Sequence, residues 1–441
     1  MTAKKITIIL FCLLITPFFC LPKPVNADEA SSPLLLKDII ASALDANLGI
    51  RNKRQATLAA LAKQKESRTY FFPVFNATYQ YTRNENEISN PLLGVITPEE
   101  EYTFVASVTQ PLFTGFATIN QYKIAELGLN VAKTNEKLVR QAVIFEATKA
   151  YFAVLKAEKL VTVAQETVTQ INAQKEVVNN FYKVGMSPLN DLLEAEVLLA
   201  NAKQQVVLAQ NTLETATSYL NILLRRPLDQ SIHLVDMLGY DPLVYDLADC
   251  LQSADENRLE IKITDLEIEL AQKNIQAAKK NYYPTVSLKG SYYRFGTEWD
   301  VNGGNGIGDE STWDIKAVAS WDFWEWGRSS YNVYEKESRL SQAVLQKSQI
   351  QDEIHFKVKQ AFLSMKAAEK NIKTVEKAIE QAKENYRINE ERYKEQVATS
   401  TDVLTAQTLL TSTMNNYYTA LYDFKIAKAS LQKEMGLEIL E

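Results

Sequence analysis

The sequence contains few of the residues that interrupt regular structure or bind metals. Its 441 residues include 14 glycines, 12 prolines, 3 cysteines and 2 histidines. Scarce glycine and proline indicate long, uninterrupted elements. His233 and His355 lie far apart in the chain, and neither has cysteines or carboxylates around it at metal-ligand spacing. We therefore predict no metal, no cofactor and no catalytic residues, and we do not expect an enzyme.

Long apolar runs and an excess of positive charge are also lacking. After residue 27, no stretch approaches the roughly 18 uninterrupted apolar residues of a membrane-spanning helix. The remaining classes are a soluble exported protein and a β-barrel protein, whose strands are too short to register as hydrophobic runs. The formal net charge is -6. No basic field is therefore present to recruit nucleic acid.

The first residues have the features of a secretory signal. Two lysines precede the apolar run Ile6 to Phe19, which is too short to span a membrane. Small residues ending at Ala27 suit the cleavage positions, so residues 1–27 are predicted to be a signal peptide. A lipid anchor on Cys20 is the alternative, which the bulky preceding residue disfavours. Cys250 then remains alone in the mature chain, which excludes an internal disulfide.

One constant shift aligns the two halves of the sequence with each other. It brings Asp191 onto Asp402 without gaps. Such self-similarity indicates a duplicated structural unit. We predict a first structural repeat at 28–228, a connector at 229–243 and a second structural repeat at 244–441. Other aligned pairs are Tyr182-Lys183 with Tyr393-Lys394, Ala150-Tyr151 with Ala361-Phe362, Phe72-Pro73 with Tyr283-Pro284, and Ala195 with Ala406.

Each repeat is expected to be mostly helical. A first helix, Leu34 to Thr69 or Val244 to Asn281, precedes two strands, a very long helix, a short turn and a long return helix. Apolar residues in the long helices recur with the period of about 3.5 that marks a coiled-coil seam. The helix from about Phe116 to Lys183 would extend roughly 100 Å, far beyond a globular domain. The seam positions are Val143, Ala147, Ala150, Val154, Ala157, Val161, Ala164, Val168 and Ile171 in one repeat, and Ile354, Val358, Ala361, Met365, Ala368, Ile372, Val375, Ile379 and Ala382 in the other.

Four segments alternate apolar and polar residues, a period of two that places one strand face in an apolar medium. Each is about 10 residues long, enough for a tilted membrane strand. We expect a bulge near Tyr292-Tyr293 and long outer loops at Asn84 to Glu101 and Gly296 to Ser311. A small sandwich packed on a soluble core is the alternative. The apolar positions are Phe75, Ala77, Tyr79 and Tyr81, then Tyr102, Phe104, Ala106 and Val108, then Trp313, Ile315, Ala317, Ala319, Trp321 and Phe323, with a less regular segment at Val286 to Phe295.

Four strands cannot close a water-filled barrel. The smallest closed barrels have about eight strands, and side chains fill their interior, so at least three chains must pool their strands. Open sheet edges are not tolerated in lipid. The predicted fold class is therefore mostly α with a small β portion. Duplicated long coiled-coil helices would form an α-helical barrel, and four strands would contribute to an oligomeric transmembrane β-barrel.

With these features in place, the sequence resembles the TolC-like outer-membrane efflux family over nearly the whole mature chain. The resemblance implies a homotrimer with a twelve-stranded barrel in outer-membrane lipid and a twelve-helix tunnel in the periplasm. The tunnel tip would meet a periplasmic adaptor protein from an inner-membrane pump or an ABC-type secretion transporter. The resemblance is carried by the duplication, by the junctions Gln110-Pro111-Leu112-Phe113-Thr114-Gly115 and Phe323-Trp324-Glu325-Trp326-Gly327-Arg328, and by the turns after Tyr182 and Tyr393, the first of which resembles the family's Tyr-x-Val-Gly tip.

The resemblance also assigns roles to residues near the two turns. Asp402 falls where the family carries a constricting carboxylate, and Thr405 replaces a second carboxylate one helical turn on. Ala398 replaces a basic residue that latches the closed tip. For Asp191, capping of the return helix and tip contacts both stay open. The predicted tip or adaptor contacts are Val184, Gly185, Met186, Asp191, Tyr393 and Gln396, the last at the glycine position of the second turn.

The predicted function is an outer-membrane channel subunit of a tripartite efflux or type I secretion system. It would give substrates delivered by an inner-membrane transporter a passive exit. The alternative is an exported periplasmic coiled-coil scaffold or adaptor, which would keep the helices but have no use for four amphipathic strands. The sequence identifies neither the substrate nor the transporter.

Overall fold

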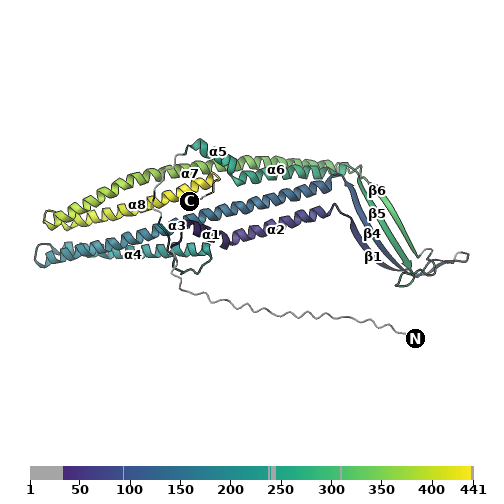
Figure 1. The fold of residues 1–441 in the computed structure, drawn as a ribbon, viewed down its shortest axis with the longest axis horizontal. Helices are drawn as coiled ribbons and strands as arrows, with labels where there is room; N and C mark the ends of the chain where they lie inside the picture. Colours follow the sequence, from purple (N-terminus) through teal and green to yellow (C-terminus); the bar gives the residue numbers. More distant parts are fainter. Residues whose placement is uncertain (1–32, 93, 237–238, 240–244, 308–309, 439–441) are drawn as a thin grey trace, which may run out of the picture.

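The computed structural model describes residues 33–92, 94–236, 239, 245–307 and 310–438. Long helices lie side by side along an elongated body, with a sheet at one end and, at the other, the two turns that join α3 to α4 and α7 to α8 (Figure 1). The predicted signal peptide, Cys20 within it and part of the predicted connector lie outside the described residues. In chain order the elements are α1 (Leu36–Ala46), α2 (Leu48–Thr69), β1 (Val74–Arg83), β2 (Ile88–Asn90), β3 (Gly94–Thr97), β4 (Glu100–Thr114), α3 (Ala117–Lys183), α4 (Leu189–Leu224), α5 (Leu247–Asn257), α6 (Leu259–Ala278), the 3-10 helix η1 (Lys279–Tyr282), β5 (Thr285–Gly296), β6 (Ser311–Ser320), α7 (Arg328–Lys394) and α8 (Ser400–Glu434).

The two long helices confirm the helical prediction. α3 and α7 each contain 67 residues, and most of their seam side chains are buried, with the return helices α4 and α8 packed against them. The core therefore runs along the helices instead of forming a central globule. Among the described residues, no helix combines the length and the apolar character needed to cross a membrane. The largest fully buried side chains include Tyr151, Phe152, Tyr422, Phe424 and Met365.

The first helix of each repeat differs from the prediction. Instead of one helix there are two, separated at Asn47 in the first repeat and at Arg258 in the second. Both residues have extended backbone, with ψ of 123° and 125°. The Asn47 side chain caps α2 by accepting a hydrogen bond from the Ile50 amide at 3.1 Å. The prediction of one continuous helix was wrong, because the extended backbone of Asn47 and of Arg258 ends one helix before the next begins. No proline stands at either break, and Gly49 in the first turn of α2 is the one nearby glycine.

The four long strands form one antiparallel sheet in the order β1-β4-β5-β6. Their register places the apolar positions of neighbouring strands opposite one another. Tyr79 pairs with Phe104, and Tyr292 pairs with Trp313. One face of the sheet is therefore apolar and the other polar, as the alternation predicts.

Two details of the sheet differ from the prediction. The pairing is continuous through Tyr292 and Tyr293, because these residues keep the alternation and face opposite sides. The register shift instead lies between Pro111 and Phe113 of β4, so the predicted bulge position was wrong. The loop expected from Asn84 to Glu101 also contains the short hairpin β2-β3, and β4 begins within it.

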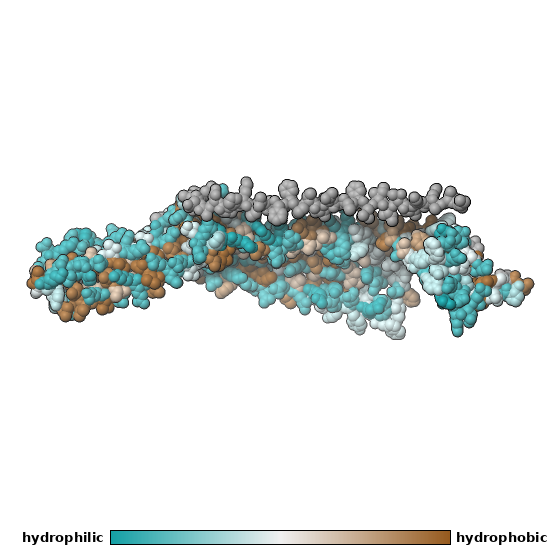
Figure 2. Space-filling model, turned by 90° about the horizontal axis from the view of Figure 1, so that it is seen from below, coloured by the Kyte–Doolittle hydropathy of each residue, from teal (hydrophilic) through white to brown (hydrophobic). Residues whose placement is uncertain are grey.

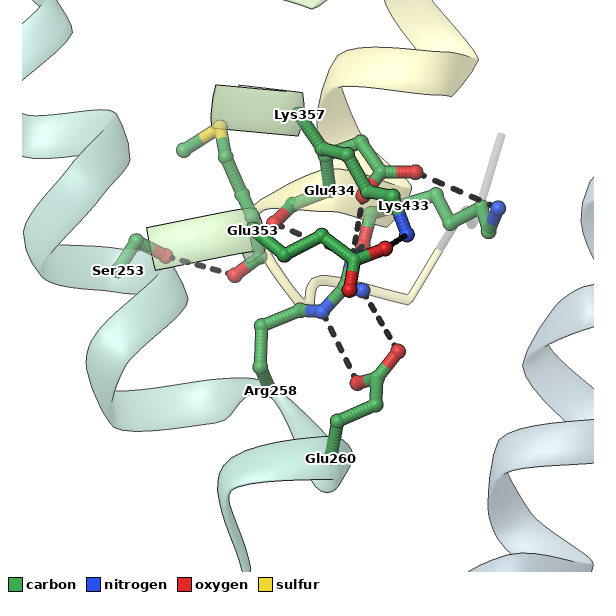
Figure 3. Close-up of polar contacts among 8 residues, drawn as sticks. Ser253, Arg258, Glu260, Glu353, Lys357, Lys433 and Glu434 are labelled. Carbon is green, nitrogen blue, oxygen red and sulfur yellow. Dashed lines mark hydrogen bonds and ion pairs between the residues drawn. The ribbon is translucent and has the colours of Figure 1, made fainter. Parts of the chain in front are cut away.

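A buried ion-pair cluster ties the end of the second repeat to its beginning (Figure 3). Arg258, only 7% exposed, lies between α5 and α6. Its Nη1 lies 2.6 Å from Glu434 Oε2 at the end of α8, and its Nη2 lies 2.6 Å from Glu260 Oε1. The Ser253 hydroxyl donates to the Met435 carbonyl at 3.2 Å. The break between α5 and α6 thus anchors the C-terminal end of α8.

The segment that follows the first repeat joins the two repeats at mid-length. Asp236 accepts a hydrogen bond from the Tyr422 hydroxyl of α8 at 3.0 Å and forms an ion pair with Lys159 of α3 at 2.7 Å. The Tyr151 hydroxyl donates to the Val235 carbonyl at 2.5 Å. Burial, together with the nearby Asp236 carboxylate, raises the pKa of Tyr151 to about 12. Burial and the Asp236 carboxylate also raise the pKa of Tyr422, so both hydroxyls stay protonated as donors.

Candidate functional site

The two turns at the helical end have the same backbone geometry. Gly185, two residues after the end of α3, has a φ of +77°, and Gln396, two residues after the end of α7, has a φ of +61°. In the first turn the Met186 amide donates to the Phe181 carbonyl at 2.8 Å, and in the second the Val397 amide donates to the Arg392 carbonyl at 2.8 Å. Both are Schellman caps, which favour glycine at the left-handed position. The second turn places glutamine there.

The surface formed by these turns is apolar and exposed. Val184 is 68% exposed, and Met186 and Val397 are also exposed. The Gln396 amide lies 4.0 Å from the Met186 sulfur, so the two turns lie side by side. We call Val184, Gly185, Met186, Gln396 and Val397 the tip surface.

Tyr393 differs from its neighbours at the tip. Its side chain is only 6% exposed, and its ring centroid lies 5.5 Å from that of Phe181 on α3. Val178 and Val403 complete the same apolar cluster. Tyr393 therefore holds the two hairpins together and presents little surface to a partner, although sequence reasoning grouped it with the tip contacts. The equivalent Tyr182 is exposed.

Asp402 forms a reciprocal cap at the start of α8. The Thr399 amide donates to Asp402 Oδ2 at 2.8 Å, and the Thr399 hydroxyl accepts from the Asp402 amide at 3.2 Å. This arrangement is a capping box. The hydrogen bond from the Thr399 amide lowers the pKa of the Asp402 carboxyl. One turn on, Thr405 is exposed, whereas Ala398 is half-buried in the cluster around Tyr393.

Asp191 does not repeat this cap in the first turn. The N-cap position of α4 is Pro188, which makes no side-chain capping bond. Asp191 instead accepts hydrogen bonds from the Ser187 hydroxyl at 2.9 Å and the Asn190 amide at 3.1 Å. Its charge in the first turn of α4 still complements the helix dipole.

Sequence reasoning missed the polar contacts that join the hairpins above the tip. The hydroxyls of Thr167 and Thr411 lie 2.9 Å apart, and Thr401 donates to Glu194 at 3.1 Å. These residues are far apart in the chain, and each falls outside the apolar seam. No local pattern could have paired them.

The sheet at the opposite end exposes both apolar surface and unpaired backbone. Phe75 is 79% exposed, and Trp313 and Ile315 are also exposed. β1 and β6 each pair with a neighbour on one side only. Exposed apolar surface favours contact with an apolar medium or partner, and unpaired strand edges favour pairing with further strands.

Comparison with known proteins identifies the family. The model of the family described as "Outer membrane efflux protein" matches residues 39–224 and 250–437. The chain belongs to the outer membrane efflux protein family. This confirms the family predicted from the junctions and the turns.

Relatives of this efflux protein are distant in sequence but close in fold. Outer membrane efflux protein BepC of Brucella suis biovar 1 (strain 1330) is 23% identical over 345 residues, covering 77% of this chain and 74% of BepC. Outer membrane protein TolC of Vibrio cholerae serotype O1 (strain ATCC 39315 / El Tor Inaba N16961) is 22% identical over 266 residues, covering 60% of this chain and 58% of TolC. The crystal structure of the Campylobacter jejuni CmeC outer membrane channel superimposes with a TM-score of 0.77 at 17% identity, covering 92% of this chain and 87% of that one.

Membership in the family has direct consequences. The efflux protein is a duct of the outer membrane that extends into the periplasm, as predicted. The fold class is also confirmed, because helices dominate and the small sheet matches structures of such channels. The alternative of a periplasmic scaffold or adaptor is set aside, because it explains neither the family match nor the exposed apolar sheet.

Proposed function

We propose that the efflux protein is the passive exit duct of a tripartite efflux or type I secretion system and works as a homotrimer without enzymatic activity. The observation that carries this proposal is the four-stranded sheet, apolar on one face and open at both edges. Lipid does not tolerate unpaired strand edges. Three copies would pool their strands and leave no edge.

Exposed apolar side chains on the helices support the same assembly. They lie on α4 and α7, away from the seams that each chain buries within itself. Figure 2 views the molecule from the side on which α4 lies and shows apolar surface near the helical end. Neighbouring subunits would cover these residues, which are Leu189, Leu193, Val197, Val207 and Leu208 on α4, and Leu345, Phe356, Leu363 and Ile388 on α7.

Purified in detergent, the full chain is expected to be a stable trimer. The reason is that both the sheet edges and the apolar helix faces need partners. Native mass spectrometry or light scattering corrected for detergent measures the mass of the assembly. A folded monomer that keeps its sheet would contradict the barrel.

We infer that the chain divides into repeats at 28–228 and 244–441, joined by 229–243. Supporting this division, the helix pair, strand pair and helical hairpin follow in the same order on both sides of the connector. The family model also matches twice.

The loop after β5 is proposed to face the outside of the cell, since it lies at the end of the sheet away from the helices (Figure 1). Asn305 in this loop is exposed. Asn305→Cys should therefore react with an impermeant thiol reagent on intact cells. Cys250 is fully buried, so the unmodified protein provides the unreactive control. Labelling that requires disruption of the outer membrane would reverse the proposed topology.

The tip surface is proposed to contact a periplasmic adaptor, which would connect the duct to an inner-membrane pump or an ABC-type secretion transporter. Val184, Gly185, Met186 and Gln396 offer exposed, mainly apolar surface. Asp191 lies one turn away on α4 and would add charge at its rim. Tyr393 would act indirectly, by keeping the two turns together.

Asp402 is proposed to form the channel constriction, with three carboxylates meeting near the axis and Thr405 one turn away. Like charges held close would favour cations over anions. Capping and constriction can be separated with two variants. Thr399→Ala removes the hydroxyl that accepts from the Asp402 amide but keeps the carboxylate. Asp402→Asn removes the charge but keeps an acceptor for the amide of residue 399.

We expect Thr399→Ala to cost about 0.5–2 kcal/mol of stability with unchanged ion selectivity. Asp402→Asn should reduce cation selectivity and block by multivalent cations, with a smaller loss of stability. The capping contribution of Asp402 is present above its ordinary pKa and is lost as the pH falls through its lowered pKa. Reversal potentials and melting curves are measured on both variants. Unchanged selectivity in Asp402→Asn would end the constriction proposal.

A further inference from the structure

The helices α2 and α6 flank α3 (Figure 1). Residues of these three helices line a cavity of about 530 Å³. It is remote in sequence from the tip surface and from the strands. Three cationic side chains of its lining, Lys133, Lys137 and Arg140, follow one another along α3. A fourth cation, Lys262, belongs to α6. The lining consists of Ile50, Asn130, Lys133, Thr134, Glu136, Lys137, Arg140, Lys262 and Leu266.

The positive charges in this cavity lack partners. Glu136 is the one carboxylate in the lining, and it already accepts a hydrogen bond from the Thr57 hydroxyl at 2.7 Å. Within the part of the chain that the structure describes, the side chains of the four cations form no ion pair or hydrogen bond. They are Lys133, Lys137, Arg140 and Lys262. By contrast, Lys347 on the equivalent helix α7 pairs with Asp265 at 2.6 Å.

The second repeat shows that the fold does not require these charges. The shift that aligns the repeats places Val344, Ser348 and Gln351 at the positions of the three α3 cations. α7 nevertheless has the same length as α3. Like charges one turn apart destabilise a helix slightly. The three cations on α3 therefore lower the stability of the first repeat without being required by the fold. A bound anion would offset this cost.

We propose that this cavity binds a small multivalent oxyanion bearing phosphate or carboxylate groups, at one site per chain. Arg140 can bind two oxygens at once, and the three lysines add mobile point charges. Ile50 and Leu266 provide apolar contact for a carbon skeleton. The volume suits a small-molecule ligand larger than one phosphate. The site goes beyond the duct function and requires neither transport nor an adaptor.

Calorimetric titration of the full-length trimer in detergent at low salt tests the proposal. Pyrophosphate and citrate are the probes, in separate experiments. We expect saturable binding of at least one probe, with one site per chain and an affinity that falls as salt is added. The variant Lys133→Gln/Lys137→Gln/Arg140→Gln should bind at least about tenfold more weakly.

A matched variant controls for the change in net charge. Lys370→Gln/Lys377→Gln/Lys383→Gln removes the same charge from exposed positions on α7 and should bind as the unmodified chain does. Lys262→Gln, on the opposite wall, gives a second and milder test should the triple variant fold poorly by circular dichroism. No saturable binding of either probe would overturn the proposal. The proposal would also be overturned if the variants in the cavity lining bound the probe as tightly as the unmodified chain, or if the α7 control lost as much affinity as they did.

Discussion

Gly185→Trp is expected to abolish transport while leaving trimers intact. Gly185 has a φ of +77°, and a Cβ added there would meet nothing within 4 Å. The indole would therefore project from the tip surface without disturbing the hairpin core. Its bulk would block close approach by an adaptor, and the backbone strain would cost about 1–2 kcal/mol. Export by producing cells and in-cell crosslinking to the adaptor measure the effect.

Gly185→Asn provides the matched control. Asparagine tolerates the left-handed conformation better than other residues with a side chain, and it is small. This variant should keep most of the export. Full export by Gly185→Trp would move docking away from the first turn. Loss of trimers in that variant would instead indicate a structural role for the turn.

Arg258→Met is expected to destabilise the helical body by about 3–5 kcal/mol. The change removes the cation from a buried cluster and leaves Glu434, itself 9% exposed, with only the longer ion pair to Lys433 at 3.3 Å. The end of α8 would then lose its anchor on the break between α5 and α6. Denaturant unfolding followed by circular dichroism, together with protease sensitivity near Glu434, gives the measurement.

Two further variants test whether the loss of stability comes from leaving a buried charge unpaired or from losing an ion pair as such. Lys347→Met breaks an ion pair with Asp265 that is much more exposed than the Arg258 cluster, and should cost at most about 1 kcal/mol. Arg258→Met/Glu434→Leu removes both buried charges and should recover much of the loss. Equal destabilisation by Lys347→Met and Arg258→Met would contradict the importance of burial.

The site was only partly predictable from sequence. Gly185 was identified because a Tyr-x-Val-Gly turn is a local motif, and its exposed turn matches that expectation. The burial of Tyr393 could not be read from the sequence, because Tyr182 has the same local context and is exposed. The difference depends on Phe181 and Val178 from the other hairpin, which no local pattern brings near.

The sequence by itself determined the duplication, the long seams and the alternating strands, because these are periodicities that depend only on neighbours along the chain. The coiled-coil period appears in residues such as Val154 and Val358, whatever helix they finally meet. Only the tertiary structure decided the breaks at Asn47 and Arg258, since no proline stands at either and Gly49, near the first break, has Glu260 at its place in the second repeat. The junction at Asp236 was likewise decided in three dimensions, because its partners come from α3 and α8. Contacts between residues distant in sequence leave no local periodicity, so their pairing is fixed only when the helices pack.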